Sequence, residues 1–195
     1  AAFEYSSNDR DARIQQYLAI AMGATKDTRY MKTLIEAMPN ADIGVVQACA
    51  FALGNIGASE AIDPLKNLLD NSEPQVRLHA VIALGKIGGS STIPLLQSML
   101  SDQEPNVRWD ASIALAKQKD SSGRSILLDL LDRKYLNSFP NIDEKEKVQV
   151  MLVAISVAHF IQNQELKSRL EDINSNDNNL KIREAARIAL GKFII

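Results

Sequence analysis

The side chains best able to carry out chemistry in this sequence stand apart from one another. The histidines His79 and His159 are isolated, with no repeated pairing of histidine and glutamate around them. The single cysteine, Cys49, excludes an internal disulfide and any metal site built from several cysteines. We therefore expect no catalytic residues, no metal and no cofactor, and we predict that the chain is not an enzyme.

An internal repeat shows which residues occupy equivalent positions in successive units. The stretch 76–105 can be laid over the stretch 45–74 without a gap. One apolar position recurs at a constant interval, at Ile14, Val45, Val76 and Val107. A period of this length with two apolar helical patterns per unit predicts a helical solenoid, in which each repeat packs mainly on its neighbours.

Within one unit, two helices are expected. Apolar residues from Val76 to Ile87 recur on one side of a helix, with Pro74 near its start and Gly88 just past its end. A second apolar helical pattern starts at Ile93. Pro near a helix start and Gly after its end are the usual boundary signals.

The fold class that follows is all-α, a right-handed α-solenoid of about five to six helical hairpins, in one domain over residues 1–195. Repeats are expected near 10–40, 41–71, 72–102, 103–135 and 144–178, with a terminal helix at 179–195. The register slips after Leu131, because the next apolar position, Val148, comes later than the constant interval from Val107 predicts. The extra residues are assigned to an inserted loop at 136–147 that enters a new helix.

Three motifs resemble a known family. Val76-Arg77, the run Ala-Leu-Gly-Lys-Ile-Gly from Ala83 to Gly88, and Ile-Pro-Leu-Leu from Ile93 are similar to the HEAT-like repeats of the phycobilisome-lyase type. The resemblance implies that the first helix of each unit lines a concave surface and that the second lies outside. Function is then expected on the first helices, although many unrelated functions share such a fold.

Positions on the presumed inner face form rows along the array. The position of Ile82 is filled by Ile20, Phe51 and Ile113 in other units, so this face is unusually apolar. Apolar anchors in a groove with charges beside them suit a peptide or a partner helix. The candidate partner-binding residues are Tyr17, Phe51, Leu78, His79, Ile82, Lys86, Trp109, Asp110, Ile113 and Lys117. The alternative, equally open, is that this row is packed core between neighbouring repeats.

Arginine occupies one position in three units, as Arg77, Arg108 and Arg183. Guanidinium groups could bind phosphates or carboxylates. By resemblance to similar repeats, we favour a structural role in which each arginine reaches acidic or backbone acceptors in the turn between repeats.

Two other functions remain open. A chaperone or bilin-lyase-like subunit could hold a tetrapyrrole against the apolar face, as the repeat family's name suggests. Asp110 beside Trp109 is similar to the acid and aromatic neighbours of HEAT-like DNA glycosylases. A net charge of −2 and a pI of about 5.8 disfavour that reading, because nucleic-acid binding requires a basic surface.

Composition places the chain among ordinary globular domains, with 46% apolar and 24% charged residues. No apolar run approaches the roughly 20 residues of a membrane span. We expect a soluble, cytoplasmic protein that binds protein or peptide and no nucleic acid. Because the sequence starts with Ala1 and not Met, a removed signal peptide or a fragment stays open.

Overall fold

The computed structural model describes residues 9–39 and 41–194, and these residues divide at Ala114 and Leu115 into an N-terminal unit and a C-terminal unit. The described residues form helices and turns, with no strand. The N-terminal unit holds α1 (Asp9–Thr25), α2 (Met31–Ala37), α3 (Ile43–Ile56), α4 (Ile62–Lys66), α5 (Pro74–Ile87), α6 (Ile93–Ser98) and most of α7 (Pro105–Lys117). Three short 3₁₀ turns, Thr28–Tyr30, Ser59–Ala61 and Met99–Ser101, adjoin α2, α4 and α6.

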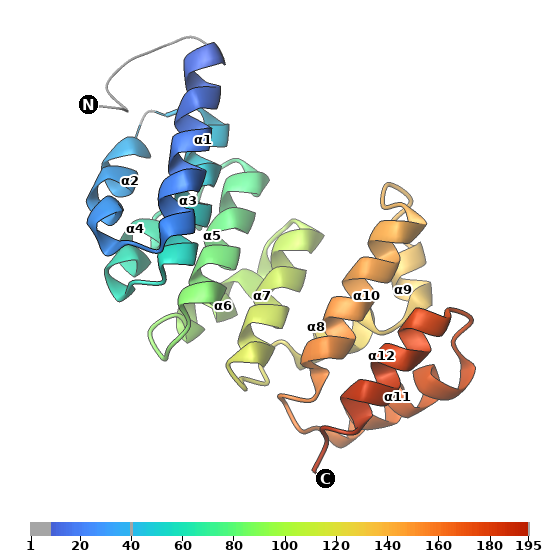
Figure 1. Cartoon of the computed structure of the whole chain (residues 1–195). Coiled ribbons are helices and arrows are strands. Elements are labelled where there is room, and N and C mark those ends of the chain that lie inside the picture. Colours follow the sequence, from blue (N-terminus) through green and yellow to red (C-terminus); the bar gives the residue numbers. More distant parts are fainter. Residues whose placement is uncertain (1–8, 40, 195) are drawn as a thin grey trace. The chain divides into compact units, whose positions relative to one another are not determined.

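The predicted period is confirmed in the N-terminal unit. Helices α3, α5 and α7 begin at Ile43, Pro74 and Pro105, so their starts are separated by the same interval as Val45, Val76 and Val107. Helix α5 starts with Pro74 in its first turn and ends at Gly88, as the boundary signals predict. The first helices α1, α3 and α5 lie side by side, and the second helices α2 and α4 pack on α3 and α5 (Figure 1).

Glycines set the distance between neighbouring first helices. A Cβ added to Gly54 of α3 would lie 2.7 Å from the Cα of Ala83 on α5. The equivalent pairs are Gly23 with Ala52 and Gly85 with Ala114, at 2.5 and 2.7 Å from the nearest atom. Real Cβ atoms do not approach so closely, so the glycines allow a backbone contact that any side chain would prevent. This close approach keeps the first helices in one continuous layer.

One residue shortly after each of α1, α3, α5 and α7 adopts a positive φ. Lys26, Gly57, Gly88 and Lys119 occupy the same repeat position and have φ values of 56°, 76°, 67° and 63°. Glycine adopts this conformation freely, and lysine does so at a cost. A positive φ is therefore kept at this position in all four repeats, although only two of them have glycine there, and ψ differs between Gly57 (17°) and Gly88 (−169°).

The C-terminal unit contains α8 (Arg124–Leu130), α9 (Arg133–Asn137), α10 (Glu144–Ala158), α11 (Gln164–Asn176) and α12 (Leu180–Leu190). Helix α12 packs on α10 and α11, and α8 packs on α9 and α10. Fully buried side chains form the core of this unit, namely Leu127, Leu130, Met151, Ile155, Leu166, Leu170, Ile182 and Ala186.

The inserted segment differs from the loop predicted at 136–147. Asp132 accepts a hydrogen bond from the backbone N–H of Lys134, and the short helix α9 runs on to Asn137. Helix α10 begins at Glu144, because Asp143 and Glu146 form a capping box at its first turn. The non-helical connection between α9 and α10 is therefore shorter than predicted, and it ends at the capping box of α10.

No helix in the described part of the chain is long and apolar enough to span a bilayer. Cys49 is fully buried in α3, and burial raises the pKa of its thiol to about 12. The thiol therefore stays protonated and serves as a small apolar core residue.

Candidate functional site

One apolar row crosses the first helices of the N-terminal unit. It consists of Ile20 on α1, Phe51 on α3, Ile82 on α5 and Ile113 on α7. Exposure falls along the row, from 45% at Ile20 through half-buried Phe51 and Ile82 to 7% at Ile113. The row is therefore exposed to solvent at α1 and buried at α7. The prediction of a contact surface fits its first part, and the packed-core alternative fits its last part.

The side chain of Lys86 contacts this row at Phe51. Its Nζ donates a hydrogen bond of 2.8 Å to Oδ1 of Asn55 and sits 4.0 Å from the centre of the Phe51 ring. A cation over an aromatic face is attracted by the ring's quadrupole. Asn55 was not among the predicted site residues, although it fills the same repeat position as Lys86. The ammonium group covers one face of Phe51 and places a positive charge beside the apolar row.

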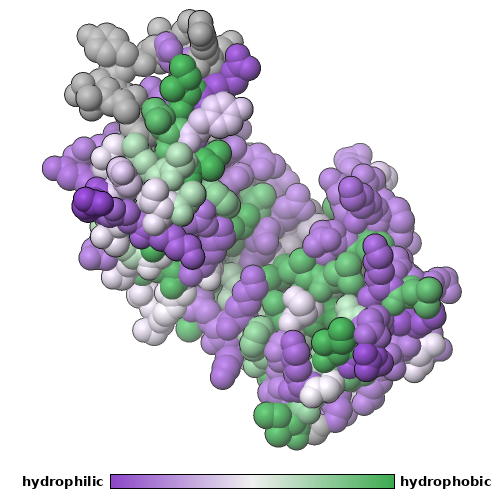
Figure 2. Space-filling model, in the orientation of Figure 1, coloured by the Kyte–Doolittle hydropathy of each residue, from purple (hydrophilic) through white to green (hydrophobic). Residues whose placement is uncertain are grey.

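Other predicted contact residues lie around the row. Tyr17 on α1 is 70% exposed, and Figure 2 shows hydrophobic surface along this helix. Leu78 and His79 on α5 are half-buried. Nδ1 of His79 lies 2.7 Å from the carbonyl oxygen of Gln75, one turn earlier in the same helix. A neutral ring with its proton on Nδ1 donates to that carbonyl and leaves Nε2 as an acceptor.

Trp109 and Ile113 on α7 lie in the interior. Trp109 is only 3% exposed, and the neighbouring Ser112 is fully buried and donates a hydrogen bond to the Trp109 carbonyl oxygen. This burial corrects the expectation that both residues touch a partner. A large apolar side chain gains most when it is removed from water, and the packed-core alternative accounts for both positions. Asp110 next to Trp109 is half-buried.

Lys117, the last predicted contact residue, falls in the C-terminal unit at the end of α7 and is exposed. The structure therefore brings together Tyr17, Phe51, Leu78, Ile82 and Lys86 on one helix layer and places Trp109 and Ile113 beneath its surface.

The arginines confirm the structural interpretation. Arg77 donates to the carbonyl oxygens of Asn71 and Ser72, Arg108 to those of Asp102 and Gln103, and Arg183 to that of Asp177. Each guanidinium group donates hydrogen bonds to backbone carbonyl oxygens in the turn that precedes its own helix. Arg77 also binds the carboxylate of Asp102, and this ion pair holds the pKa of Asp102 below its ordinary value. These donors are engaged within the chain.

The two histidines belong to different units, His79 to α5 and His159 to the end of α10. Burial and the nearby charge of Lys192 lower the pKa of His159, so its ring favours the neutral form. Nδ1 of His159 is buried without a hydrogen-bond partner, and the ring lies 4.1 Å from that of Phe160. No group of three or more metal-ligating side chains occurs among the described residues.

Comparisons with known proteins agree on the fold. A solved structure of the Escherichia coli protein YibA matches with a TM-score of 0.61 and 20% identity, over 97% of this chain and 72% of that one. The complex of CpcE and CpcF of phycocyanin lyase from Nostoc sp. PCC7120 matches with a TM-score of 0.57 and 17% identity, over 99% and 80%. A designed armadillo repeat protein in complex with the peptide (KR)4 matches with a TM-score of 0.55 and 19% identity, over 98% and 96%.

A search of curated proteins finds no match. The family model for HEAT repeats matches residues 2–77 and 62–136, which together span more than half of the sequence. The structural matches and the family model together establish an all-α solenoid fold. The chain belongs to the HEAT repeat family.

Proposed function

We propose that this protein is a non-enzymatic interaction module whose N-terminal unit binds a peptide or a helical segment on its first-helix layer. The observation that carries the proposal is the open end of the apolar row, where Tyr17 and Ile20 on α1 are 70% and 45% exposed. Large apolar side chains at such exposure on one helix face are typical of contact surfaces.

We propose that only some of the partner-binding residues predicted from the sequence contact the bound segment. Tyr17, Ile20, Phe51, Leu78 and Ile82 offer apolar surface, and Lys86 supplies a charge held in place by Asn55. Trp109 and Ile113 support the layer from within. Apolar anchors provide affinity, and a fixed charge beside them orients the bound segment.

The likeness to a designed armadillo repeat protein that was solved with a bound peptide supports the proposal, since it shows that this fold accommodates a peptide. The likeness to the phycocyanin lyase subunits is one of fold, and the tetrapyrrole alternative loses Trp109 from the apolar face because this side chain is buried. The glycosylase alternative depends on the same residue beside Asp110, and it is disfavoured for the same reason.

Site-specific cross-linking tests the proposal. A photoreactive phenylalanine analogue is placed at Tyr17, and a control protein carries it at Ile194, which is 92% exposed in the C-terminal unit. After irradiation in cell extract, mass spectrometry should find a recurrent protein segment cross-linked through position 17 and absent from position 194.

The double variant Tyr17→Asp/Ile20→Asp then measures the contribution of the row. It should weaken binding of the identified segment at least tenfold, while Ile194→Asp should leave binding unchanged. Equal binding by the two variants, with both folded by circular dichroism, would remove the N-terminal face as the binding surface.

A further inference from the structure

Helix α1 has an uncovered face at positions that the next first helix buries. Ile14 is 48% exposed, whereas Val45, which fills the same repeat position on α3, is fully buried. Ala21 is also exposed, and its equivalent Ala52 is fully buried and packs on Gly23 of α1. No helix precedes α1 among the described residues. The α1 face therefore lacks the neighbour that α1 itself provides for α3.

Helix α12 has the complementary uncovered face. Gly191 fills the repeat position of Gly23 and Gly54, each of which packs on an alanine of the following first helix. In the described part of the chain, a Cβ added to Gly191 would meet only the carbonyl oxygen of Ile188, at 3.6 Å. Ile188 itself is 51% exposed. Helix α12 thus presents the glycine side of a helix contact, and α1 presents the alanine side.

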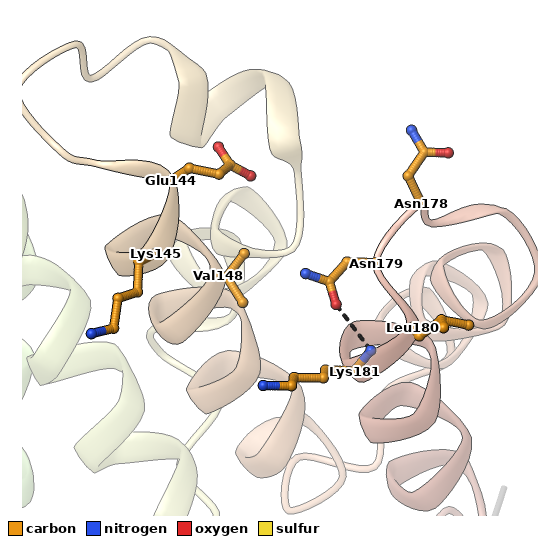
Figure 3. A pocket seen from close by; sticks show the side chains of 7 residues that line it. All are labelled: Glu144, Lys145, Val148, Asn178, Asn179, Leu180 and Lys181. Carbon is orange, nitrogen blue, oxygen red and sulfur yellow. Dashed lines mark hydrogen bonds between the residues drawn. The ribbon is translucent and has the colours of Figure 1, made fainter.

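Figure 3 shows which side of α12 is covered by α10. Lys181 extends toward α10, and Leu180, which is largely exposed, is directed away from the space between the two helices. Oδ1 of Asn179 accepts a hydrogen bond of 2.9 Å from the backbone N–H of Lys181 and fixes the start of α12 (Figure 3). The helical period places three further residues on the same side as Leu180, namely Glu184, Ile188 and Gly191. This side is the α12 face.

An existing contact indicates how charges on the two faces would meet. The side-chain amide of Gln16 on α1 lies against Gly44 at the start of α3. Glu184 fills the position of Gln16 on α12, and the exposed Arg13 fills the position of Gly44 on α1. The same approach of two first helices would bring these opposite charges together. Glu184 already accepts from Arg187 at 2.6 Å, and a carboxylate can accept from two guanidinium groups.

A second existing contact indicates an apolar match. Nζ of Lys86 on α5 lies 4.0 Å from the centre of the Phe51 ring on α3. Ile188 fills the position of Phe51 on α12, and Ala24 fills the position of Lys86 on α1. The same approach would therefore place an exposed isoleucine on an exposed alanine. Burial of such side chains favours association.

From these matches we infer that the α12 face of one copy of this chain binds the α1 face of a second copy, as a following first helix would. The contact joins three pairs: Gly191 with Ala21, Glu184 with Arg13 and Ile188 with Ala24. Each dimer keeps one free face of each kind, so association proceeds past the dimer. The inference does not rest on the proposed function, and Tyr17 and Ile20 stay unchanged in all of its test variants.

Arg187 makes this contact weaker than the packing between consecutive repeats. It fills the position of Ala50 and Val81, which are fully buried on α3 and α5. A charged side chain at such a position keeps part of the interface in water. We therefore expect a reversible association that depends on protein concentration.

Sedimentation velocity of the full chain over a range of concentrations tests the inference. The average mass should rise past that of a dimer. Ala21→Arg and Gly191→Arg each place a long side chain in the contact, and each should raise the dissociation constant at least tenfold. Both positions are exposed, so the variants should keep their helicity in circular dichroism. The control Asn67→Arg adds the same charge at an exposed position after α4 and should associate like the parent chain.

Mixing the two variants shows whether the two faces bind each other. Ala21→Arg keeps its α12 face and Gly191→Arg keeps its α1 face, so an equimolar mixture should form a dimer and nothing larger. A monomeric parent chain, a mixture without dimer, or variants that associate like the parent overturn the inference. A control that associates as weakly as the variants does the same.

An exchange of charges tests the pairing of Glu184 with Arg13. Arg13→Glu and Glu184→Arg should each weaken the association, because like charges then meet across the contact. The chain that carries both changes should regain it at an unchanged net charge. A double variant as weak as the single variants contradicts the inferred register of the two helices.

Discussion

Arg133 binds Asp177 with the same geometry that joins Arg77 to Asp102. In both pairs Nε donates at 2.7 Å and Nη2 at 2.9 Å to the two carboxylate oxygens. Both aspartates also accept from the backbone N–H two residues further on, Glu104 or Asn179, at 2.8 Å. The regular arginine position is filled by Gln149 in α10, and the short helix α9 supplies Arg133 in its place. The short helix just before the connection to α10 thus provides a second ion pair of the same geometry.

Removing the arginine of the buried pair should be costly. Arg77→Met leaves the Asp102 carboxylate, whose side chain is 6% exposed, without its partner, and we expect a loss of about 3 kcal/mol of unfolding free energy. Urea unfolding followed by circular dichroism measures the loss. The control Arg29→Met breaks the exposed pair with Asp27 and should change the midpoint little. Similar losses in both variants would contradict this account.

The same ion pairs predict a dependence of stability on acid. Hydrogen bonds from Arg77 and Arg133 hold the pKa values of Asp102 and Asp177 below the ordinary 3.8. Their contribution is complete above the ordinary value, since both folded and unfolded chains are then ionised. It is lost as the pH falls below about 3.8, where the unfolded chain takes up protons first.

Unfolding free energies measured between about pH 5 and pH 3 check this dependence. Asp102→Asn and Asp177→Asn should each be less stable at the upper end and should show a flatter pH profile than the parent chain. A profile as steep as that of the parent would mean that other carboxylates cause the acid sensitivity.

The glycine contacts predict a steric effect. Gly54→Ala forces a Cβ against the backbone of Ala83 and should cost about 1–3 kcal/mol, even though alanine favours helix formation. Gly191→Ala is the control, because Gly191 has a helical φ of −62° and its nearest atom lies at 3.6 Å. That variant should be neutral or slightly stabilised. Equal stability of the two variants would show that the helices separate at no cost.

The positive φ after α7 predicts a stabilising change. Lys119→Gly relieves the left-handed conformation of lysine, at φ 63°, and should add about 1 kcal/mol. Lys117→Gly, two residues earlier in the last turn of α7, should cost about 1 kcal/mol. Thermal or urea unfolding of the two variants should therefore shift in opposite directions, and a loss in both would refute the prediction.

Much of the fold follows from local patterns in the sequence. The constant spacing of Val45, Val76 and Val107 and the Pro and Gly boundaries of α5 predict helices that the structure contains. These signals are local, because a helix is determined mainly by its own periodicity and ends. The structural role of the arginines also follows, since Arg77, Arg108 and Arg183 share one repeat position.

The candidate site was predictable only in part. The sequence identifies the rows of residues on the first helices, but exposure depends on how each helix packs on the next. Tyr17 and Ile20 are open, whereas Trp109 and Ile113, in equally favourable sequence positions, are buried. The contact between Lys86 and Phe51 likewise requires a particular side-chain direction.

By itself, then, the sequence determined the helical repeat, its register and the point at which the register fails. The tertiary structure decided which apolar positions face water. It also decided that Arg133 pairs with Asp177, where the repeat has Gln149 at the arginine position. Arg133 and Asp177 lie 44 residues apart outside any repeat spacing, so no periodic signal connects them. Periodicity is a property of neighbouring residues along the chain, whereas burial and ion pairing depend on distances that exist only after the helices have packed.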